Sequence, residues 1–301
     1  MKEIDQVLLK KVIIERPRSS HKGDYGRLLL LGGTYPYGGA IIMTALAAVH
    51  SGAGLVTVGT DRENITALHS HLPEAMAFDL GDKQLLEQQL QKASVVLVGP
   101  GLVDDECGEE LLQTVFHHLV QDQTLIMDGG ALSIVAKTGM KFPEAHLILT
   151  PHQREWQVLS GLDLDSQGTE ETGEALIRFP SETILVQKGP ATRIWQAGQV
   201  DCYQLSVGGP YQATGGMGDT LAGMIAGFAG QFPQASLYER VTAATYLHSA
   251  IAQELAEDNY VVLPTRISQQ IPTFMKKIQK ESGIKIGNSL EFDFVVPPPH
   301  S

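Results

Sequence analysis

The sequence predicts an α/β fold of three layers, in which a mostly parallel central sheet is flanked by helices on both faces. Short apolar segments recur along the chain, and they are nearly continuous rather than alternating, as is typical of strands buried on both faces of a parallel sheet. Helix-length segments lie between most of these strands. Alternating strands and helices indicate a parallel sheet, because each crossover connection returns over one face of it.

Six strands are predicted in the first two thirds of the chain, and each ends at a turn signal, most of them rich in glycine or proline. The strands cover residues 27–31, 55–58, 95–98, 125–127, 147–149 and 183–186. Helices are expected between them, for example over residues 39–50, 83–92 and 108–120.

The pattern changes after residue 188. Segments 192–196 and 201–205 flank a short turn and predict an antiparallel hairpin at an edge of the sheet. Helices are then expected over residues 218–230, from 236 to about 257, and over 265–280. The polar and acidic segment 162–174 is interpreted as a surface connection.

Length and composition limit the possible classes of protein. The 301 residues show no repeat, and we expect one domain over residues 1–301 with its core at about 21–280. Lys plus Arg is 22 and Asp plus Glu is 34, so the net charge is 22 − 34 = −12, which argues against a nucleic-acid partner. Only Cys107 and Cys202 are present, which excludes a disulfide framework and fits the cytoplasm.

One segment, residues 40–59, has the length of a membrane span and no formal charge. Residues 51–54 interrupt it with Ser-Gly-Ala-Gly, so we interpret it as a helix, a glycine turn and a buried strand. The amino-terminal residues lack the apolar core of a signal peptide. We therefore expect no membrane association.

The glycine-rich segment 208–221 is the strongest candidate binding site. It directly precedes a predicted helix, and glycines with free N–H groups at a helix start favour phosphate oxygens. It is not a Walker A loop, because no Lys-Ser/Thr pair follows its glycines. Its single acid, Asp219, has two interpretations that its spacing leaves open: a helix cap, or a base that takes a proton from an attacking hydroxyl.

Residues 214–223 resemble the anion-hole signature of the ribokinase-like superfamily. Four further segments, in the same order and spacing, resemble the ADP/ATP-dependent NAD(P)H-hydrate dehydratases of that superfamily. These segments are residues 21–26, 98–102, 149–156 and 187–189. The resemblance implies the three-layer ribokinase-like fold.

The resemblance also implies a reaction. Members of that family repair NADH and NADPH that carry water at C6 of the nicotinamide ring (NADHX and NADPHX). ADP or ATP phosphorylates the C6 hydroxyl with Mg²⁺ as cofactor, and loss of phosphate restores NAD(P)H; AMP is released if ADP is the donor. Phosphate is the better leaving group, because hydroxide leaves poorly.

Functional residues follow from the matched positions. The resemblance assigns Asp219 as the base, in contact with the hydrate, and the backbone N–H groups of Gly216, Met217 and Gly218 as the cradle of the transferred phosphoryl group. Contacts to the hydrate are also implied for Ala40, Gly101 and His152. The nucleotide would be held by Lys188, Gly189, Pro190, Ala191, Thr192 and Gly218.

Two acids have a less defined place in this pattern. Glu155 is expected to support Mg²⁺ through water, although an acid in the first turn of a helix is equally expected on structural grounds. Asp128 is assigned structural or metal support. The chain departs from the family pattern at Gly209, where Asn is usual, and at Gln212, where Met is frequent, and the missing Asn is expected to alter a substrate contact.

The resemblance bears on assembly as well. Family members are often homotetramers, which makes a homo-oligomer the expectation here. Many bacterial relatives carry an epimerase domain of ~200 residues ahead of this one, but only 20 residues precede His21, so we expect the dehydratase alone.

Two other functions remain open. A kinase of the same superfamily, acting on a vitamin precursor or a sugar, would share the fold and the anion hole. A nucleotide-sensing protein without catalysis would need only the nucleotide site. The segment from Thr150 to Trp156 favours the dehydratase over the kinase, and the presence of Asp219 argues against the sensor.

Overall fold

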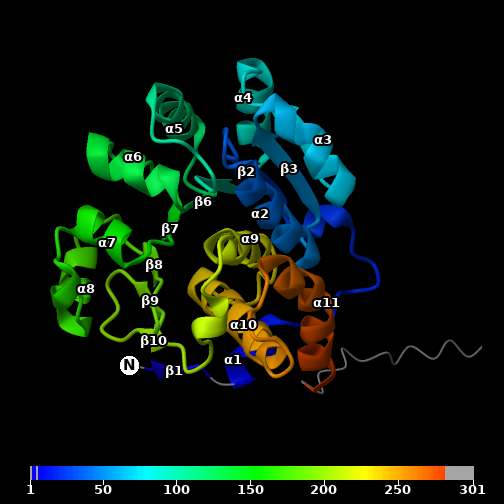
Figure 1. Cartoon of the computed structure of the whole chain (residues 1–301), viewed down its shortest axis with the longest axis vertical. Helices are drawn as coiled ribbons and strands as arrows, with labels where there is room; N and C mark the ends of the chain where they lie inside the picture. Colours follow the sequence, from blue (N-terminus) through cyan, green and yellow to red (C-terminus); the bar gives the residue numbers. More distant parts are fainter. Residues whose placement is uncertain (1, 5, 282–301) are drawn as a thin grey trace, which may run out of the picture.

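A computed structural model describes residues 2–4 and 6–281, and these residues form a sheet of ten strands with helices on both faces (Figure 1). The strand order is β1-β10-β9-β8-β7-β6-β5-β2-β3-β4. Neighbouring strands are parallel except at β8–β9 and β9–β10. The strands are β1 (Lys2–Glu3), β2 (Arg27–Leu31), β3 (Leu55–Thr60), β4 (Met76–Asp79), β5 (Val95–Val98), β6 (Thr124–Met127), β7 (His146–Leu149), β8 (Ile184–Gln187), β9 (Arg193–Gln196) and β10 (Tyr203–Gln204).

The helices divide between the two faces of the sheet. In Figure 1, α5 to α8 lie on the left of the sheet, and α2, α9, α10 and α11 lie on the right. The helices are α1 (Gln6–Val12), α2 (Gly38–His50), α3 (Arg62–His71), α4 (Lys83–Lys92), α5 (Glu106–His118), α6 (Gly130–Thr138), α7 (Gln153–Ser160), α8 (Thr169–Leu176), α9 (Met217–Ala229), α10 (Leu237–Ala256) and α11 (Pro264–Glu281).

Each central strand contributes side chains to two hydrophobic cores, because successive side chains point to opposite faces of the sheet. In β2, Leu28 and Leu30 join the core beneath α2, α9 and α10, whereas Leu29 and Leu31 join the core beneath α4 to α7. All four leucines are almost fully buried. This explains why the strand sequences are continuously apolar, and it confirms the predicted three-layer α/β class.

The six predicted strands and the named helices are confirmed, with boundaries shifted by at most two residues. Residues 40–59 form most of α2, a turn and β3, as expected. No helix within residues 2–4 and 6–281 combines the length and apolar character needed to cross a membrane.

Two expectations about the second half are wrong in part. The hairpin exists as β9 and β10, but it does not form the edge of the sheet, because β1 from the amino terminus pairs in parallel with β10. The segment 162–174, interpreted as a surface connection, includes most of α8. Thr172 and Ala175 of that helix are buried, so its acidic residues cover only the outer side.

The topology determines where a ligand can bind. The chain moves outward from β2 through β3 to β4 on one side, and from β5 through β6 to β8 on the other. The adjacent strands β2 and β5 therefore form the switch point, and ligands of open α/β sheets bind beyond the carboxyl ends of the strands there. Gly99, which follows β5, has φ +123°, and a methyl group on it would lie 1.7 Å from the carbonyl oxygen of Asp128, so the turns after β5 and β6 touch.

Candidate functional site

Asp219 lies in the first turn of α9, at the carboxyl-end side of the sheet. The helix begins at Met217, and its N-cap is Gly216 in the left-handed conformation (φ +95°), where glycine is strongly preferred. Asp219 is thus the third helical residue and not the N-cap, and no side-chain hydrogen bond caps this helix. The structural interpretation of Asp219 as an N-cap is therefore wrong.

The buried position of Asp219 changes its acidity. The pKa of its carboxyl group is raised to about 6, mainly by burial and in part by the charge of Asp128, whereas Lys188 lowers it. A carboxylate with a pKa near neutrality is a competent general base at physiological pH.

Lys188 and Asp128 form a buried ion pair beside this turn. Lys188 Nζ donates to Asp128 Oδ1 at 2.7 Å, and their side chains are 19% and 4% exposed. The hydroxyl of Thr150 donates to the same oxygen at 2.7 Å. Burial lowers the pKa of Lys188, but Asp128, Glu155 and Asp219 outweigh it, so the net pKa is raised and the ammonium is retained.

The ammonium of Lys188 also faces the amino end of α9. A methyl group placed on Gly218 would lie 3.2 Å from Lys188 Nζ. The helix end carries partial positive charge and unpaired N–H groups, so the two features direct positive potential into the same space. Such an arrangement favours an anion, and it explains how an acidic chain can bind phosphate.

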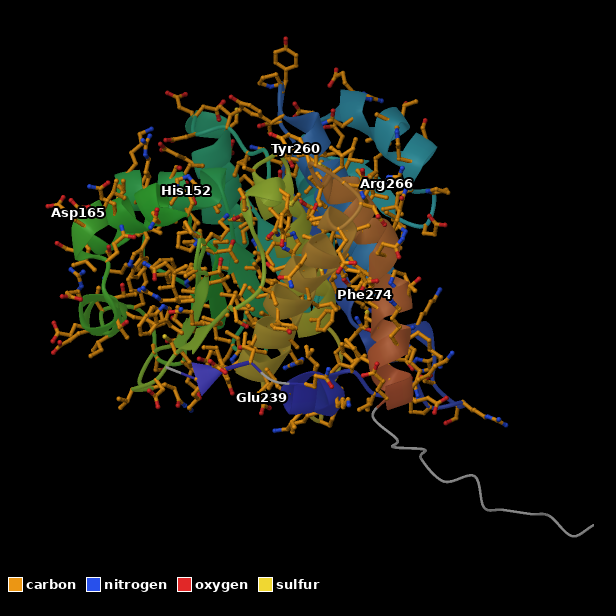
Figure 2. All side chains as sticks on the ribbon, turned by 60° about the horizontal axis from the view of Figure 1, so that its bottom comes forward. His152, Asp165, Glu239, Tyr260, Arg266 and Phe274 are labelled. Atoms are coloured by element: carbon orange, nitrogen blue, oxygen red, sulfur yellow. The ribbon has the colours of Figure 1, made fainter. Side chains whose placement is uncertain are left out.

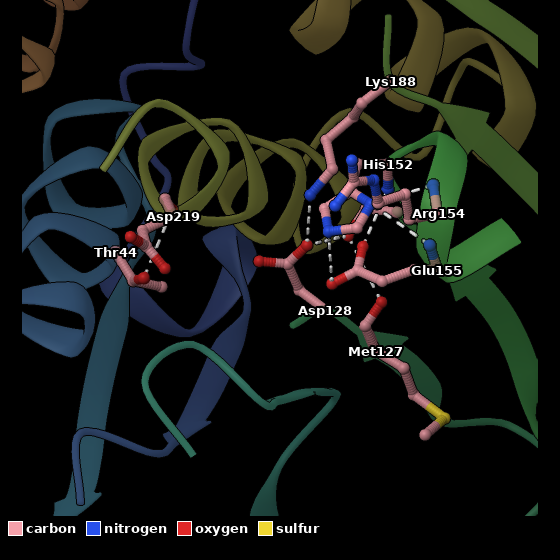
Figure 3. A network of polar contacts seen from close by, with 9 residues as sticks. Thr44, Met127, Asp128, His152, Arg154, Glu155, Lys188 and Asp219 are labelled. Carbon is pink, nitrogen blue, oxygen red and sulfur yellow. Dashed lines mark hydrogen bonds and ion pairs between the residues drawn. The ribbon is translucent and has the colours of Figure 1, made fainter. Parts of the chain in front are cut away.

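His152 and Glu155 occupy the first turn of α7 (Figure 3). His152 is the N-cap: its Nδ1 accepts from the N–H groups of Arg154 and Glu155 at 3.1 Å each. In return, Glu155 Oε2 accepts the N–H of His152 at 2.7 Å. The neutral imidazole therefore carries its proton on Nε2, which lies 3.5 Å from Glu155 Oε1. Glu155 is therefore an acid in the first turn of a helix, as expected on structural grounds, and its side chain also lies at the candidate site.

The acids of the site influence one another. Burial raises the pKa of Glu155, Lys188 lowers it, and Asp128 raises it. Figure 3 shows Asp128 between Asp219 on one side and Glu155 with His152 on the other. A single cluster therefore includes the ends of β6, β7 and β8 and the start of α9.

Ala40 and Gly101 lie side by side on the other flank of Asp219. A methyl group on Gly101 would lie 2.9 Å from the Cβ of Ala40. The hydroxyl of Thr44 donates to the backbone oxygens of both Ala40 (2.9 Å) and Asp219 (3.2 Å), which joins the first turns of α2 and α9. Ala40 and Gly101, two of the residues assigned to the hydrate, therefore follow β2 and β5, the strands at the switch point of the sheet.

A cavity of about 560 Å³ adjoins the cluster. Five of the six residues assigned to the nucleotide line it, namely Lys188, Gly189, Pro190, Thr192 and Gly218. Ala191 is not among the lining residues. The cavity has the size of ordinary small-molecule sites.

Sequence reasoning missed one wall of this cavity. Thr245, His248 and Ser249 of α10 line it, together with Leu205 and Leu221. These three polar residues of α10 lie at positions i, i+3 and i+4, so the sequence places them on one face of the helix.

The two departures from the family pattern also lie in this cavity. Gly209 and Gln212 both line it, beside Lys188 and Gly218. The Gln212 side chain turns back and accepts the N–H of Gly209 at 3.2 Å. The two positions that depart from the family pattern, where an altered substrate contact is expected, therefore border the candidate nucleotide cavity.

One matched segment lies elsewhere. Residues 21–26 precede β2 and so lie at the opposite end of that strand from the site. Lys22 O would be 1.8 Å from a methyl group on Gly54, which indicates a packing role for this segment. Figure 2 shows the two ends of the molecule, with His152 and Tyr260 toward one and Glu239 toward the other.

The site offers few ligands for a metal. Within residues 2–4 and 6–281, no group of three or more His, Cys, Asp or Glu side chains could hold a metal ion. Mg²⁺ does not need such a group, because it commonly binds one or two carboxylates, substrate phosphates and water. The Glu155 side chain, only 13% exposed and with Oε1 free of a backbone hydrogen bond, fits that mode.

Comparisons with known proteins identify the family of this chain. The family model described as NAD(P)H-hydrate dehydratase matches residues 28–273. A protein of Streptococcus pneumoniae named ADP-dependent (S)-NAD(P)H-hydrate dehydratase is 71% identical over 284 residues, which cover 94% of this chain and 98% of that protein.

Solved structures give the same result. A ribokinase-like superfamily protein from Enterococcus faecalis has a TM-score of 0.88 at 40% identity, covering 92% of this chain and 96% of that one. An ADP/ATP-dependent NAD(P)H-hydrate dehydratase from Bacillus subtilis, co-crystallised with ATP and Mg²⁺, has a TM-score of 0.79 at 29% identity, covering 91% and 97%. The fold is ribokinase-like, and the chain belongs to the NAD(P)H-hydrate dehydratase family.

Proposed function

We propose that this chain is a hydro-lyase that dehydrates C6-hydrated NADH and NADPH with ADP as the phosphoryl donor. The observation that carries the proposal is the position of Asp219. Its carboxylate, with a pKa of about 6, lies in the same helical turn as an N–H cradle and close to a buried lysine. The relatives named for ADP support the choice of donor.

In the first step, the carboxylate of Asp219 accepts the proton of the C6 hydroxyl while that oxygen attacks the terminal phosphorus of the donor. The new P–O bond forms as the bond to the leaving phosphate oxygen breaks, which releases AMP from ADP. Negative charge develops on the transferred group. The N–H groups of Gly216, Met217 and Gly218 and the ammonium of Lys188 would stabilise that charge.

In the second step, the C–O bond at C6 breaks and phosphate leaves with the bonding electrons, assisted by the lone pair of the ring nitrogen. Loss of a proton from C5 then restores the ring double bond. Ala40 and Gly101 would present small residues to the flat ring, and Gly101 packs so closely that a methyl group on it would lie 2.5 Å from Tyr37 O and 2.9 Å from Ala40 Cβ. His152, whose Nδ1 is used in capping, can present only Nε2 to the hydrate.

Mg²⁺, when bound with the nucleotide, would neutralise phosphate charge. Glu155 would hold the ion through water, and Asp128 would support the site indirectly by holding Lys188. Asp128 would then contribute mainly by fixing the ammonium of Lys188, to which it is hydrogen-bonded at 2.7 Å.

The test is a repair assay with hydrated NADH or NADPH, Mg²⁺ and either ADP or ATP, followed at a wavelength where only the restored cofactor absorbs. We expect recovery with ADP and little or none without nucleotide. Asp219→Asn should bind nucleotide but lose turnover by about 10²–10⁴-fold, the usual contribution of a general base. Absence of recovery with both nucleotides would overturn the proposal.

The same assay separates the alternatives. A kinase would leave a stable phosphorylated product instead of free phosphate, and a sensor would bind ADP without turnover of any hydroxylated substrate. No observation of the site favours either of them.

Assembly and location extend the proposal. We expect a homotetramer that acts in the cytoplasm on small molecules, without nucleic acid or membrane as partner. Sedimentation equilibrium of the purified chain, with its subunit mass of 32.6 kDa, measures the first of these directly.

A further inference from the structure

A buried histidine lies in the wall of the nucleotide cavity, and no role has been given to it so far. His248 belongs to α10, is only 4% exposed, and lines the cavity together with Thr245 and Ser249. Its Nε2 is buried and has no hydrogen-bond partner among the described residues. A buried polar nitrogen without a partner is uncommon in native proteins, and a ligand that supplies the partner is one explanation for it.

The surroundings of His248 keep it neutral. Burial lowers the pKa of its imidazole to about 4, and no charged group among residues 2–4 and 6–281 opposes or adds to that effect. A neutral imidazole gives little attraction to phosphate, whereas it can form a hydrogen bond with an uncharged group.

The cavity is lined by charged and by apolar residues, and a neutral imidazole is better suited to the uncharged half of a nucleotide than to its phosphates. Lys188 and Gly218 mark the phosphate end, where the ammonium and the N–H groups converge. Apolar side chains of Leu205, Val207 and Leu221 line the cavity as well, and they suit the faces of a base. The neighbouring Thr245 hydroxyl is already used, since it donates to the Val241 carbonyl at 2.8 Å.

We propose that His248 is a nucleotide-binding residue whose Nε2 hydrogen-bonds the nucleoside half of the phosphoryl donor. This inference rests on the proposed function in one respect, namely that the cavity holds a nucleotide. The bond would select the nucleoside and leave the phosphoryl transfer to Asp219 and Lys188. AMP, which has the same nucleoside half as ADP, would therefore depend on His248 to the same extent.

The experiment is calorimetric titration of the purified full chain with ADP and with AMP. His248→Leu removes the nitrogen while keeping an apolar side chain, and His248→Gln restores a polar group of similar reach. Thr242→Val is the matched control, because Thr242 is a buried polar residue of the same helix that bonds Tyr238 O and does not line the cavity.

For His248→Leu we expect the Kd of ADP and of AMP to rise by the same factor, roughly tenfold, the effect of one lost hydrogen bond. His248→Gln should recover most of the affinity, and Thr242→Val should stay within about twofold of the wild type. The Tm of His248→Leu without nucleotide should not fall, because an unpaired buried nitrogen contributes no stability.

Four results would overturn the inference: unchanged affinity in His248→Leu, an equal loss in Thr242→Val, no recovery in His248→Gln, or a loss for ADP without a loss for AMP. If the wild type binds ATP and not ADP, the same comparison with ATP applies. A wild type that binds neither nucleotide would overturn the proposed function itself. If instead the wild type binds and His248→Leu binds equally well, only the inference about His248 is overturned.

Discussion

Removal of the Lys188 ammonium should cost this protein far more stability than removal of an exposed lysine. Lys188 Nζ and Asp128 Oδ1 are 2.7 Å apart, and the Asp128 side chain is only 4% exposed. Lys188→Met would leave the carboxylate of Asp128 in the protein interior with the hydroxyl of Thr150 as its remaining described hydrogen-bond donor. Deletion of one partner of a buried pair costs about 3–5 kcal/mol.

The assay is urea unfolding followed by far-ultraviolet circular dichroism and by the fluorescence of the buried Trp156 and Trp195. Lys137→Met is the matched control, because Lys137 pairs with Asp104 at 3.1 Å but is 56% exposed. Such a surface pair is screened by water and contributes little to stability.

A double variant separates the pair from other effects of the substitution. Lys188→Met with Asp128→Asn removes both charges, so it should recover about 1–3 kcal/mol relative to the sum of the single variants. If Lys188→Met loses no more than Lys137→Met, or if the two substitutions are additive, the pair is not the buried structural unit described above.

Four further predictions concern the site. The activity kcat/KM should fall about tenfold per pH unit below pH 6, because Asp219 must be ionised to accept a proton and its pKa is about 6; a flat profile between pH 5 and 7 would contradict this. Because that pKa is raised on folding, ionised Asp219 destabilises the fold above about pH 6 and not below about pH 4. Asp219→Asn should therefore raise the Tm at pH 7.5, by the equivalent of at most about 3 kcal/mol. At pH 4 the same substitution should leave the Tm unchanged. Gly216 has φ +95°, and a methyl group on it would lie 2.4 Å from Met43 Cε, so Gly216→Ala should lower the free energy of unfolding by at least about 1–2 kcal/mol. A methyl group on Gly215 would have nothing within 4 Å, so Gly215→Ala should lower it by less than about 1 kcal/mol in thermal unfolding. Glu155→Gln keeps an oxygen for the His152 N–H but loses the charge, so half-maximal activity should need about tenfold more Mg²⁺, and an unchanged requirement would remove Glu155 from metal support.

Much of the fold could be predicted from the sequence because burial on both faces leaves a strong local signal. Strands such as β2 and β5 are continuously apolar, and their boundaries agree closely with the prediction. By contrast, β1 consists of Lys2 and Glu3, both exposed, and it is a strand only because its backbone pairs with β10. No local pattern distinguishes such a segment from a loop.

The same distinction applies to the site. The glycines of residues 208–218 and the acid at 219 form one continuous sequence signal, so the glycine turn and the start of α9 could be predicted. The raised pKa of Asp219 could not, because it depends on burial and on Asp128, which is distant in the sequence. His248 is an intermediate case, since the sequence places it on one helix face with Thr245 and Ser249 but does not reveal the cavity that these residues line.

The central claim is that Asp219 directs phosphorylation of the C6 hydroxyl before the oxygen leaves, and an oxygen label tests it most directly. The hydrate is prepared with ¹⁸O at C6 and converted in unlabelled water with ADP and Mg²⁺, and the products are analysed by mass spectrometry. We predict that the label appears in the released inorganic phosphate in proportion to the NADH formed, and that Asp219→Asn forms neither. Label found in water, with unlabelled phosphate, would contradict the account.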